Sequence, residues 1–265
     1  MYPYLLKIGS FHLSSYGFML ALSFILGILL AARRAKKQQV DPNIIIDLSF
    51  YIIVTAIIGA RVYYVLPHLQ EFRGNFWRVF AVWEGGLSMY GGVILATVFV
   101  LLYMWKKRLP VWKIADIYAP SIALGLGLTR IGCFLRGSCF GKPTNVSWAV
   151  VFPPDSPAGM QFPATAIHPT QLYASLYGFV ILFALLFLER FKRSNGFTFW
   201  LFILIYSISR FLIDFIRYYE NSMILTTIWG KAISLNQGIS VVLFVVASAM
   251  LLKLRWNQLK AESLA

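Results

Sequence analysis

The chain alternates between long apolar runs and short polar stretches. Seven of the apolar runs are long enough, or nearly so, to cross a bilayer as α-helices. They lie near residues 16–32, 47–66, 88–105, 114–133, 171–189, 197–216 and 238–254. No linker or low-complexity tract divides them. The pattern therefore predicts an all-α integral membrane protein with seven transmembrane helices, in a single membrane domain that covers residues 1–265.

A long polar interruption, from about 134 to 170, is rich in residues that favour turns. These residues are Gly137, Gly141, Pro143, Pro153, Pro154, Pro157, Gly159, Pro163 and Pro169. Between them, residues 148–152 have the β-branched and aromatic character of a short strand. We expect this segment to form a small extracytoplasmic head of turns and short strands.

Composition supports the membrane assignment, because 59% of the residues are hydrophobic and the mean hydropathy is +0.70. A soluble domain cannot bury that much apolar surface. The net charge of +14 is unevenly spread: 14 of the 24 basic residues follow the first, third, fifth and seventh runs, and seven lie on the other side. The positive-inside rule then places the N-terminus outside and the C-terminus in the cytoplasm. The charge therefore indicates contact with anionic lipid rather than with nucleic acid.

The first residues of the chain and its two cysteines exclude two further features. The first 15 residues lack the basic, apolar and small-residue pattern of a cleaved signal peptide, so we expect the first run to remain as an anchor. Cys133 and Cys139 have a spacing that matches no common zinc motif. We therefore expect neither a metal site nor a cofactor.

Three arginines, Arg61, Arg130 and Arg210, fall inside or at the ends of the apolar runs. A charged side chain in hydrocarbon costs about 3 kcal/mol or more, so it usually faces a polar cavity and marks a functional site. All three fall toward the outer ends of their runs. We expect them to share a polar cavity that opens toward the outer leaflet, and Tyr16 at the start of the first run to reach it.

The segment Gly85–Gly92 carries two glycine pairs around Leu87 to Tyr90 and opens the third run. Paired glycines permit unusual backbone angles and the close approach of a ligand, and a helix N-terminus attracts anions. Gly91 and Gly92 are therefore candidate substrate-binding residues. The alternative is close packing of two membrane helices through small residues.

Arg130 ends the fourth run, and a turn punctuated by Gly137 and Gly141 follows it. A guanidinium group at this position can hold a phosphate through two parallel hydrogen bonds. The alternative is an arginine that extends to the interface without a specific partner.

His168 lies in the segment Ala166–Tyr173, which opens the fifth run. Pro169 suits the first turn of a helix. A histidine beside the expected cavity can act as a general base near neutral pH. The alternative is a histidine that caps the helix or bonds to the backbone.

Tyr206, Arg210, Asp214 and Arg217 are spaced i, i+4, i+8 and i+11 in the sixth run. This spacing predicts one polar face on a single helix, with Asp214 orienting an arginine. A polar stripe on an apolar helix must face protein or water rather than lipid. The alternative is a purely structural ion pair.

Taken in order, these segments resemble the prolipoprotein diacylglyceryl transferase family. The matching pieces are Ser15–Gly17, Gly59–Arg61, Gly85–Gly92, Arg130–Gly132 with Gly137 and Gly141, His168–Tyr173, and Arg210 with Asp214 and Arg217. They spread over roughly residues 15–240, and their combination is far more specific than any one of them. The resemblance implies seven spans, an outward N-terminus and a periplasmic head.

The resemblance also implies a bacterial inner-membrane enzyme that moves a diacylglyceryl group from phosphatidylglycerol to the lipobox cysteine of a prolipoprotein signal peptide. It carries the essential arginines of the family onto Arg130 and Arg210, which are expected to hold the phosphate. No cofactor is implied, and no oligomeric state is predicted. The substrate supplies the nucleophile, so a base rather than an enzyme nucleophile is required.

This chain departs from the family pattern at several positions. Tyr90 stands where a histidine is common, Cys133 where asparagine is common, and Ser138 where an acid is common. Asp214 replaces a glutamate, and Asn236-Gln237-Gly238 replaces a Gly-Gln order. Tyr90 and His168 are thus both candidates for the base. The alternatives are a diverged phospholipid-headgroup enzyme and an anionic-lipid-binding or transport protein.

Overall fold

A computed structural model describes residues 4–8, 11–72, 74–82, 85–192, 194–219, 224–228 and 231–263. The chain forms two compact units, one of Met1–Leu30 with Ala115–Ala265 and the other of Ala31–Ile114. The boundaries fall inside two helices, α1 (Ser15–Lys37) and α4 (Val111–Arg136). Each unit is described by itself.

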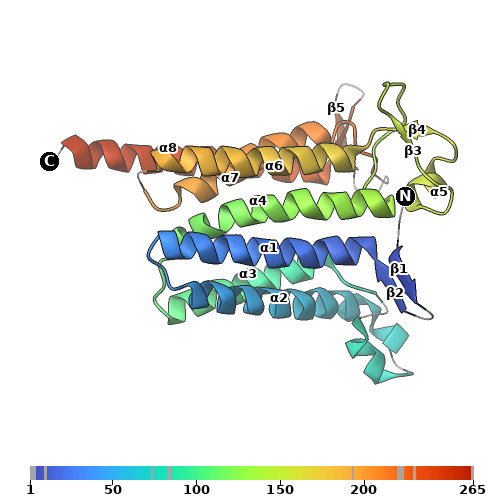
Figure 1. Ribbon diagram of the computed structural model, residues 1–265, viewed down its shortest axis with the longest axis horizontal. Coiled ribbons are helices and arrows are strands. Elements are labelled where there is room, and N and C mark those ends of the chain that lie inside the picture. Colours follow the sequence, from blue (N-terminus) through green and yellow to red (C-terminus); the bar gives the residue numbers. More distant parts are fainter. Residues whose placement is uncertain are drawn as a thin grey trace. The chain divides into compact units, whose positions relative to one another are not determined.

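The first unit is a bundle of long apolar helices. Besides most of α1 and α4 it contains α5 (Pro157–Gln161), α6 (Thr170–Leu188), η4 (Glu189–Phe191), α7 (Phe197–Ile213) and α8 (Leu235–Ser263). Figure 1 shows α6, α7 and α8 running side by side, with α4 next to them. Across the described part of the chain, six helices are long and apolar enough to span a membrane, and α7, with 17 residues, is a shorter apolar helix. The predicted all-α membrane fold is confirmed.

The helix ends lie within five residues of the predicted span boundaries except at the end of α8. Two of the differences concern the last two helices. The sixth span was predicted to reach residue 216, but α7 ends at Ile213. Beyond it the backbone pairs with another segment: the Lys142 N–H donates to the Ile216 oxygen (2.8 Å), and the Tyr218 N–H donates to the Phe140 oxygen (3.2 Å). The last helix, α8, continues past residue 254 to Ser263. The prediction followed the apolar run only, whereas the helix extends beyond it into polar sequence.

Helices of the first unit pack closely through small residues. A Cβ atom on Gly178 of α6 would lie 2.7 Å from the Gly127 nitrogen of α4, and the Ser175 hydroxyl donates to the Gly127 oxygen (2.8 Å). A Cβ atom on Gly132 would lie 2.9 Å from the Met19 Cβ of α1. Such contacts are the usual means by which membrane helices approach one another. The buried cluster at this level is Ala119, Ala123, Ile181, Leu182, Leu185 and Phe202.

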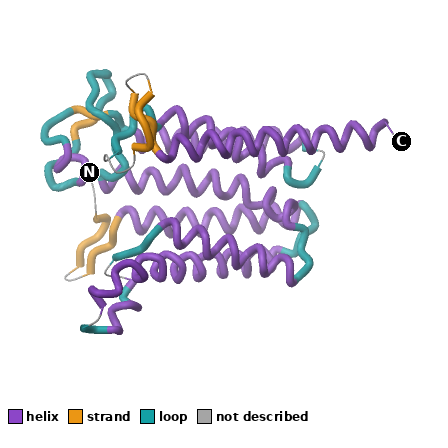
Figure 2. Tube along the Cα trace, turned by 180° about the vertical axis from the view of Figure 1, so that it is seen from behind, coloured by secondary structure: helices purple, strands orange, loops and turns teal. Residues whose placement is uncertain are grey.

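Short antiparallel strand pairs lie at the ends of the helices (Figure 2). They are β1 (Tyr4–Ile8) with β2 (Phe11–Ser14), β3 (Val150–Val151) with β4 (Ala166–Ile167), and β5 (Ile224–Ile228) with β6 (Lys231–Ser234). The strand predicted at 148–152 is confirmed for Val150 and Val151. Phe152, Ala158 and Ile167 form the buried core of the head, against Phe134, Phe140, Val150 and Phe162.

The second unit pairs α2 (Pro42–Val65) with α3 (Met89–Lys106), which η1 (Leu66–Phe72) and η2 (Phe76–Phe80) connect. Asp41 caps the start of α2 by accepting from the Asn43 N–H (2.9 Å). The two helices touch at glycines: a Cβ atom on Gly91 would lie 2.3 Å from the Gly59 oxygen, and one on Gly92 would lie 2.9 Å from the Ala56 oxygen. Backbone contact at this distance leaves no room for any side chain.

Candidate functional site

Arg130 lies near the end of α4, and the chain leaves this helix through a tight glycine cap. Gly137 has a φ of +74°, its N–H donates to the Phe134 oxygen (3.0 Å), and the Ser138 N–H donates to the Cys133 oxygen (3.0 Å). This is the Schellman arrangement, which requires a left-handed residue that glycine supplies without strain. The cap turns the chain back over the end of α4, next to Arg130.

Gly141 is the point where three backbone segments meet. Its N–H donates to the His168 oxygen (3.1 Å), and it forms an isolated antiparallel bridge with Arg217. A Cβ atom on Gly141 would lie 2.6 Å from the Cβ of His168. Gly141 therefore lets His168 and Arg217 approach the turn after α4, which explains why a glycine occupies the position.

His168 precedes α6, with Pro169 as the residue that caps the helix rather than one inside its first turn. Its Nδ1 lies 3.4 Å from the Tyr173 hydroxyl, which also accepts from the Trp148 indole N–H (2.6 Å). Its main-chain N–H donates to the Lys142 oxygen (3.0 Å). The imidazole is partly exposed and keeps its Nε2 for another partner.

Arg210 sits in the last turn of α7 and belongs to a buried polar cluster. Its Nη2 donates to the Tyr219 hydroxyl (2.5 Å) and lies 3.4 Å from the Asp214 carboxylate. The Tyr219 and Ser234 hydroxyls each donate to Asp214 (2.9 Å), whose side chain is fully buried. These contacts hold Asp214 so that one edge of the Arg210 guanidinium is fixed.

Tyr219 remains a donor at neutral pH, since burial raises its pKa to about 12. Asp214 is thus satisfied by two hydroxyl groups as well as by Arg210. The other edge of Arg210 differs, because Nη1 is buried and has no hydrogen-bond partner among the described residues. Buried donors without partners are rare in proteins, and they suggest that a ligand completes them.

Arg217 does not lie on the helical face predicted for it. The prediction of four residues on one helix is wrong at its end, because α7 stops at Ile213 and Asp214 is its C-cap. Arg217 instead joins the bridge with Gly141, and its guanidinium carbon lies 5.2 Å from the centre of the Tyr219 ring. Its Nε is also buried without a partner in the part of the chain that the structure describes.

The arginines from the two helices and the loop converge. Tyr177 of α6 lies within the electrostatic reach of Arg130, Arg210 and Arg217. The Tyr206 ring packs 6.5 Å from the Tyr177 ring, centre to centre. The sequence-based expectation that Arg130 and Arg210 share a site therefore matches the geometry of the first unit. Arg217 adds a third cation to it.

Tyr16 and Cys139 border the same cluster. Tyr16 of α1 is an electrostatic neighbour of Arg130, and its Cα would lie 3.2 Å from a Cβ on Gly132. Cys139 has a φ of +59°, and its oxygen accepts from the Thr170 hydroxyl (3.0 Å). A hydrogen bond from the Cys133 thiol, with the charges of Arg217 and Arg130, lowers the pKa of Cys139 to about 5. These neighbours favour the thiolate form of Cys139.

Sequence reasoning missed Cys139, Tyr177 and Tyr219 as members of the site. Cys139 was considered only as a metal ligand, and its left-handed backbone has no sequence signal. Tyr177 lies seven residues after Thr170, two helical turns into α6, which was a usable signal. No group of three or more potential metal-binding side chains occurs in the described ranges.

Three of the predicted residues lie in the second unit, together with Tyr90. The Arg61 guanidinium donates to four backbone oxygens, those of Val79 (2.8 Å), Arg78 (2.5 Å), Gly85 (2.6 Å) and Gly86 (3.1 Å). It thereby shapes the glycine segment that precedes α3.

The other predicted residues of this unit lie at the start of α3. Gly91 and Gly92 are buried in the contact with α2, so the geometry supports the packing alternative. Tyr90, in the first turn of α3, is 46% exposed and free to meet a ligand.

Comparisons with known proteins agree on one family. The sequence profile described as prolipoprotein diacylglyceryl transferase matches residues 3–253. A phosphatidylglycerol–prolipoprotein diacylglyceryl transferase of Trichormus variabilis is 34% identical over 81% of this chain and 78% of its own length. The protein of the same name from Halalkalibacterium halodurans is 32% identical over 98% of this chain and 87% of its own, and that from Clostridium tetani is 32% identical over 82% and 86%.

Proposed function

Because the chain belongs to the prolipoprotein diacylglyceryl transferase family, we propose that it transfers a diacylglyceryl group from phosphatidylglycerol to a cysteine of a prolipoprotein. The acceptor is the lipobox cysteine thiol of the signal peptide, and glycerol phosphate is the leaving group. The multi-pass helical fold suits a donor and an acceptor that both reside in the membrane.

The observation that carries this proposal is the pair of unsatisfied guanidinium donors beside Arg130. Arg210 Nη1 and Arg217 Nε are both buried without a described partner. The phosphate of phosphatidylglycerol is an anion with several acceptor oxygens, and arginine binds such groups through paired hydrogen bonds. A bound phosphate would supply both missing acceptors and balance the excess positive charge.

The same arginines suit the chemistry. The acceptor thiolate attacks the terminal glycerol carbon of the diacylglyceryl group, a carbon–sulfur bond forms, and the bond from that carbon to the phosphate oxygen breaks. Negative charge grows on the leaving phosphate, where a fixed cation lowers the barrier. Arg130 and Arg210 hold that oxygen in our proposal, Arg217 assists, and Asp214 orients Arg210.

The acceptor thiol has an ordinary pKa near 8.5 and must lose a proton before the attack. His168 and Tyr90 are the candidate bases. His168 is favoured because it abuts Gly141 and thus borders the arginine-bearing loop. Tyr16 and Tyr206 line the site. Gly137 and Gly141 allow the backbone of the site to turn. In the second unit, Arg61, Gly91 and Gly92 shape the segment around the start of α3.

We place the protein in the bacterial cytoplasmic membrane with its N-terminus outside and its C-terminus in the cytoplasm. The uneven distribution of basic residues supports this orientation. The head and the arginine cluster then lie at the outer face, where secreted prolipoproteins present their cysteine.

The test is a mass-spectrometric assay with purified protein, phosphatidylglycerol and a lipobox peptide. We expect a diacylglyceryl mass increment on the peptide cysteine, and its loss in Arg130→Ala and in Arg210→Ala. Arg190→Ala is the matched control, since Arg190 stacks on Phe187 (3.5 Å to the ring centre) at the far end of α6. A folded wild-type protein that binds phosphatidylglycerol but leaves the peptide unmodified would rule out the transferase and favour a headgroup enzyme or a lipid-binding protein.

A further inference from the structure

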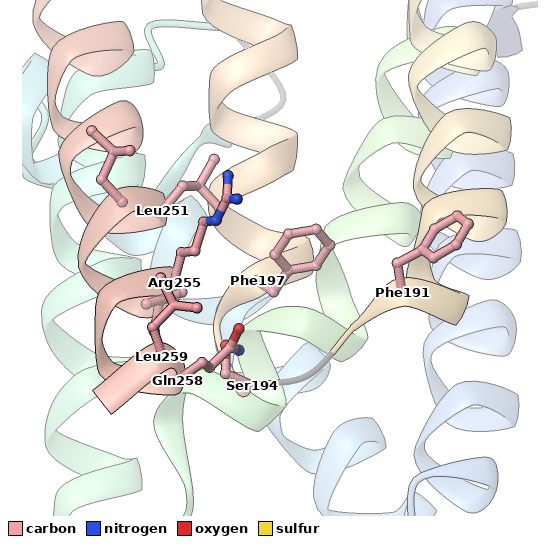
Figure 3. A pocket seen from close by; sticks show the side chains of 9 residues that line it. Phe191, Ser194, Phe197, Leu251, Arg255, Gln258 and Leu259 are labelled. Atoms are coloured by element: carbon pink, nitrogen blue, oxygen red, sulfur yellow. The ribbon is translucent and has the colours of Figure 1, made fainter. Parts of the chain in front are cut away.

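A pocket lies at the end of the first unit that is opposite to Arg210. It has a volume of about 530 Å³ and lies between the segment that joins α6 to α7 and the last part of α8. Figure 3 shows Phe197 opposite Leu251, Arg255 and Leu259, with Phe191 on the other side of Phe197. Pockets of roughly 300–1,000 Å³ hold small ligands in proteins.

The walls of this pocket are apolar, and its polar groups gather on one side. Six of the nine lining residues are Phe or Leu, and Arg255, Gln258 and Ser194 are the polar ones. Leu251, Arg255 and Leu259 are spaced by four residues, so they share one face of α8. A ligand that fits must therefore combine an apolar body with a polar, anionic end.

The polar side of the pocket lacks internal partners. Arg255 forms no ion pair with any described side chain, and the buried Ser194 hydroxyl has no hydrogen-bond partner among the described residues. Residues 186–196 and 250–260 contain six Lys or Arg and one acid, Glu189. Lys192 pairs with the buried Asp116 (2.9 Å), and this end of the unit still carries an excess of positive charge.

The pocket also spans the boundary between hydrocarbon and headgroups. The uninterrupted apolar sequence of α8 runs to Leu252, and charged residues begin at Lys253 and Arg255. Trp256, next to it, is 62% exposed, and exposed tryptophan in membrane proteins concentrates at the level of the headgroups. Leu252, one turn earlier, is 68% exposed, as expected of a leucine at the level of acyl chains.

We infer that this pocket binds one anionic phospholipid molecule of the adjacent leaflet, with its phosphate on Arg255 and Gln258 and an acyl chain against Phe197, Leu251 and Leu252. The guanidinium group provides a forked pair of donors for the phosphate. This site is separate from the arginine cluster of the proposed active site, and it does not depend on the proposed function.

Native mass spectrometry of delipidated protein tests the inference. The starting protein carries Arg130→Ala and Arg210→Ala, so that the other anion site is removed. We titrate it with phosphatidylglycerol or with phosphatidylcholine of the same acyl chains. We expect one phosphatidylglycerol to be retained in preference to phosphatidylcholine, with binding about tenfold weaker after Arg255→Ala.

Two further variants make the outcome decisive. Lys260→Ala removes the same charge from α8 outside the pocket and should leave binding unchanged. Leu252→Trp keeps the charge, fills the pocket from an exposed position and should weaken binding as Arg255→Ala does. Three results would overturn the inference. The protein would retain both lipids equally, Lys260→Ala would weaken phosphatidylglycerol binding as much as Arg255→Ala does, or Arg255→Ala or Leu252→Trp would bind as well as the starting protein. A dimer mass in place of bound lipid would assign the pocket to a second copy of the chain.

Discussion

The Asp116 carboxylate of α4 accepts a hydrogen bond of 2.7 Å from the main-chain N–H of Gly196, the residue before α7. It also accepts from the Phe199 N–H (2.8 Å) and pairs with Lys192 (2.9 Å), and its side chain is fully buried. Gly196 brings no side chain of its own to cap α7, so a residue 80 positions away performs this task.

This bond sets the register of two helices that carry site residues. Asp116 lies 14 residues before Arg130, and Gly196 lies 14 residues before Arg210. Both helices rise about 1.5 Å per residue, so the two arginines lie at one level, about 21 Å from the bond.

We therefore expect Asp116→Ala to lower the free energy of unfolding by about 3 kcal/mol, because Lys192 and two helix N–H groups lose their partner. Thermal unfolding in detergent measures this effect, and kcat/KM with phosphatidylglycerol should fall with it. Asp47→Ala, at an exposed position of α2, is the control and should change stability by less than about 0.5 kcal/mol. An Asp116→Ala protein that unfolds with the wild-type midpoint would contradict this role.

Arg210→Lys should lose most of the activity, by about 100-fold, although the charge is kept. An ammonium group cannot contact Tyr219 and Asp214 on one side while offering a second nitrogen to a phosphate on the other. Initial rates of peptide modification measure the loss, with Arg190→Lys as the control. Wild-type turnover in Arg210→Lys would remove the role as a phosphate clamp.

Tyr219→Phe should reduce kcat/KM by about tenfold, since Arg210 and Asp214 both lose a hydroxyl partner and the guanidinium is held less firmly. Tyr218→Phe is the matched control, because its hydroxyl accepts from Gln161 in the head. We expect little change in that variant. If the two variants behaved alike, the orienting role of Tyr219 would be wrong.

Cys139 should react with iodoacetamide along an unusual pH profile. Its lowered pKa of about 5 means that the thiolate is already populated above pH 5, whereas an ordinary cysteine needs a pH near 8.5. The alkylation rate should thus rise between about pH 4 and 6 and stay level above. Phosphatidylglycerol should slow it by occupying the neighbouring arginines.

Cys133→Ala provides the comparison for this experiment, since it removes the hydrogen bond that contributes most to the lowered pKa. The midpoint should move to higher pH in that variant. A wild-type midpoint at or above pH 8 would show that the surroundings of Cys139 do not stabilise a thiolate.

Gly91→Ala should destabilise the pairing of α2 and α3, because the added Cβ would lie 2.3 Å from the Gly59 oxygen and 2.2 Å from the Tyr63 Cβ. Gly125→Ala is the control, since its Cβ would meet nothing within 4 Å. The yield of monodisperse protein and its melting temperature report the difference. Equal stability in the two variants would mean that the helices separate easily at this contact.

Much of the fold and part of the site were accessible from the sequence. The apolar runs located every long helix, because a backbone in lipid must satisfy its own hydrogen bonds and therefore forms helices. The sequence also predicts that Arg130 and Arg210 share a site, since a charge in an apolar run needs a polar cavity. The turn residues of the head, Gly137 and Gly141 among them, were equally visible.

Other features depended on contacts between distant segments. The sequence pattern continued the sixth helix to Arg217, yet pairing of residues 216 and 218 with the loop after α4 ended it at Ile213. The carboxylate oxygens of Asp116 have no partner that the local sequence predicts. Their partners lie some 80 residues away, and they come within hydrogen-bond distance only because α4 and α7 pack together.

The sequence by itself determined that this chain has several apolar runs long enough to span a membrane. It also determined that the arginines within those runs need polar surroundings, and which family the chain resembles. Only the tertiary structure decided which arginine nitrogens are already occupied. The Arg61 guanidinium donates to four backbone oxygens. In contrast, Arg210 and Arg217 each have a buried donor without a described partner. The reason is physical: periodicity sets local helices, but a hydrogen bond across the fold depends on distances that no local pattern encodes.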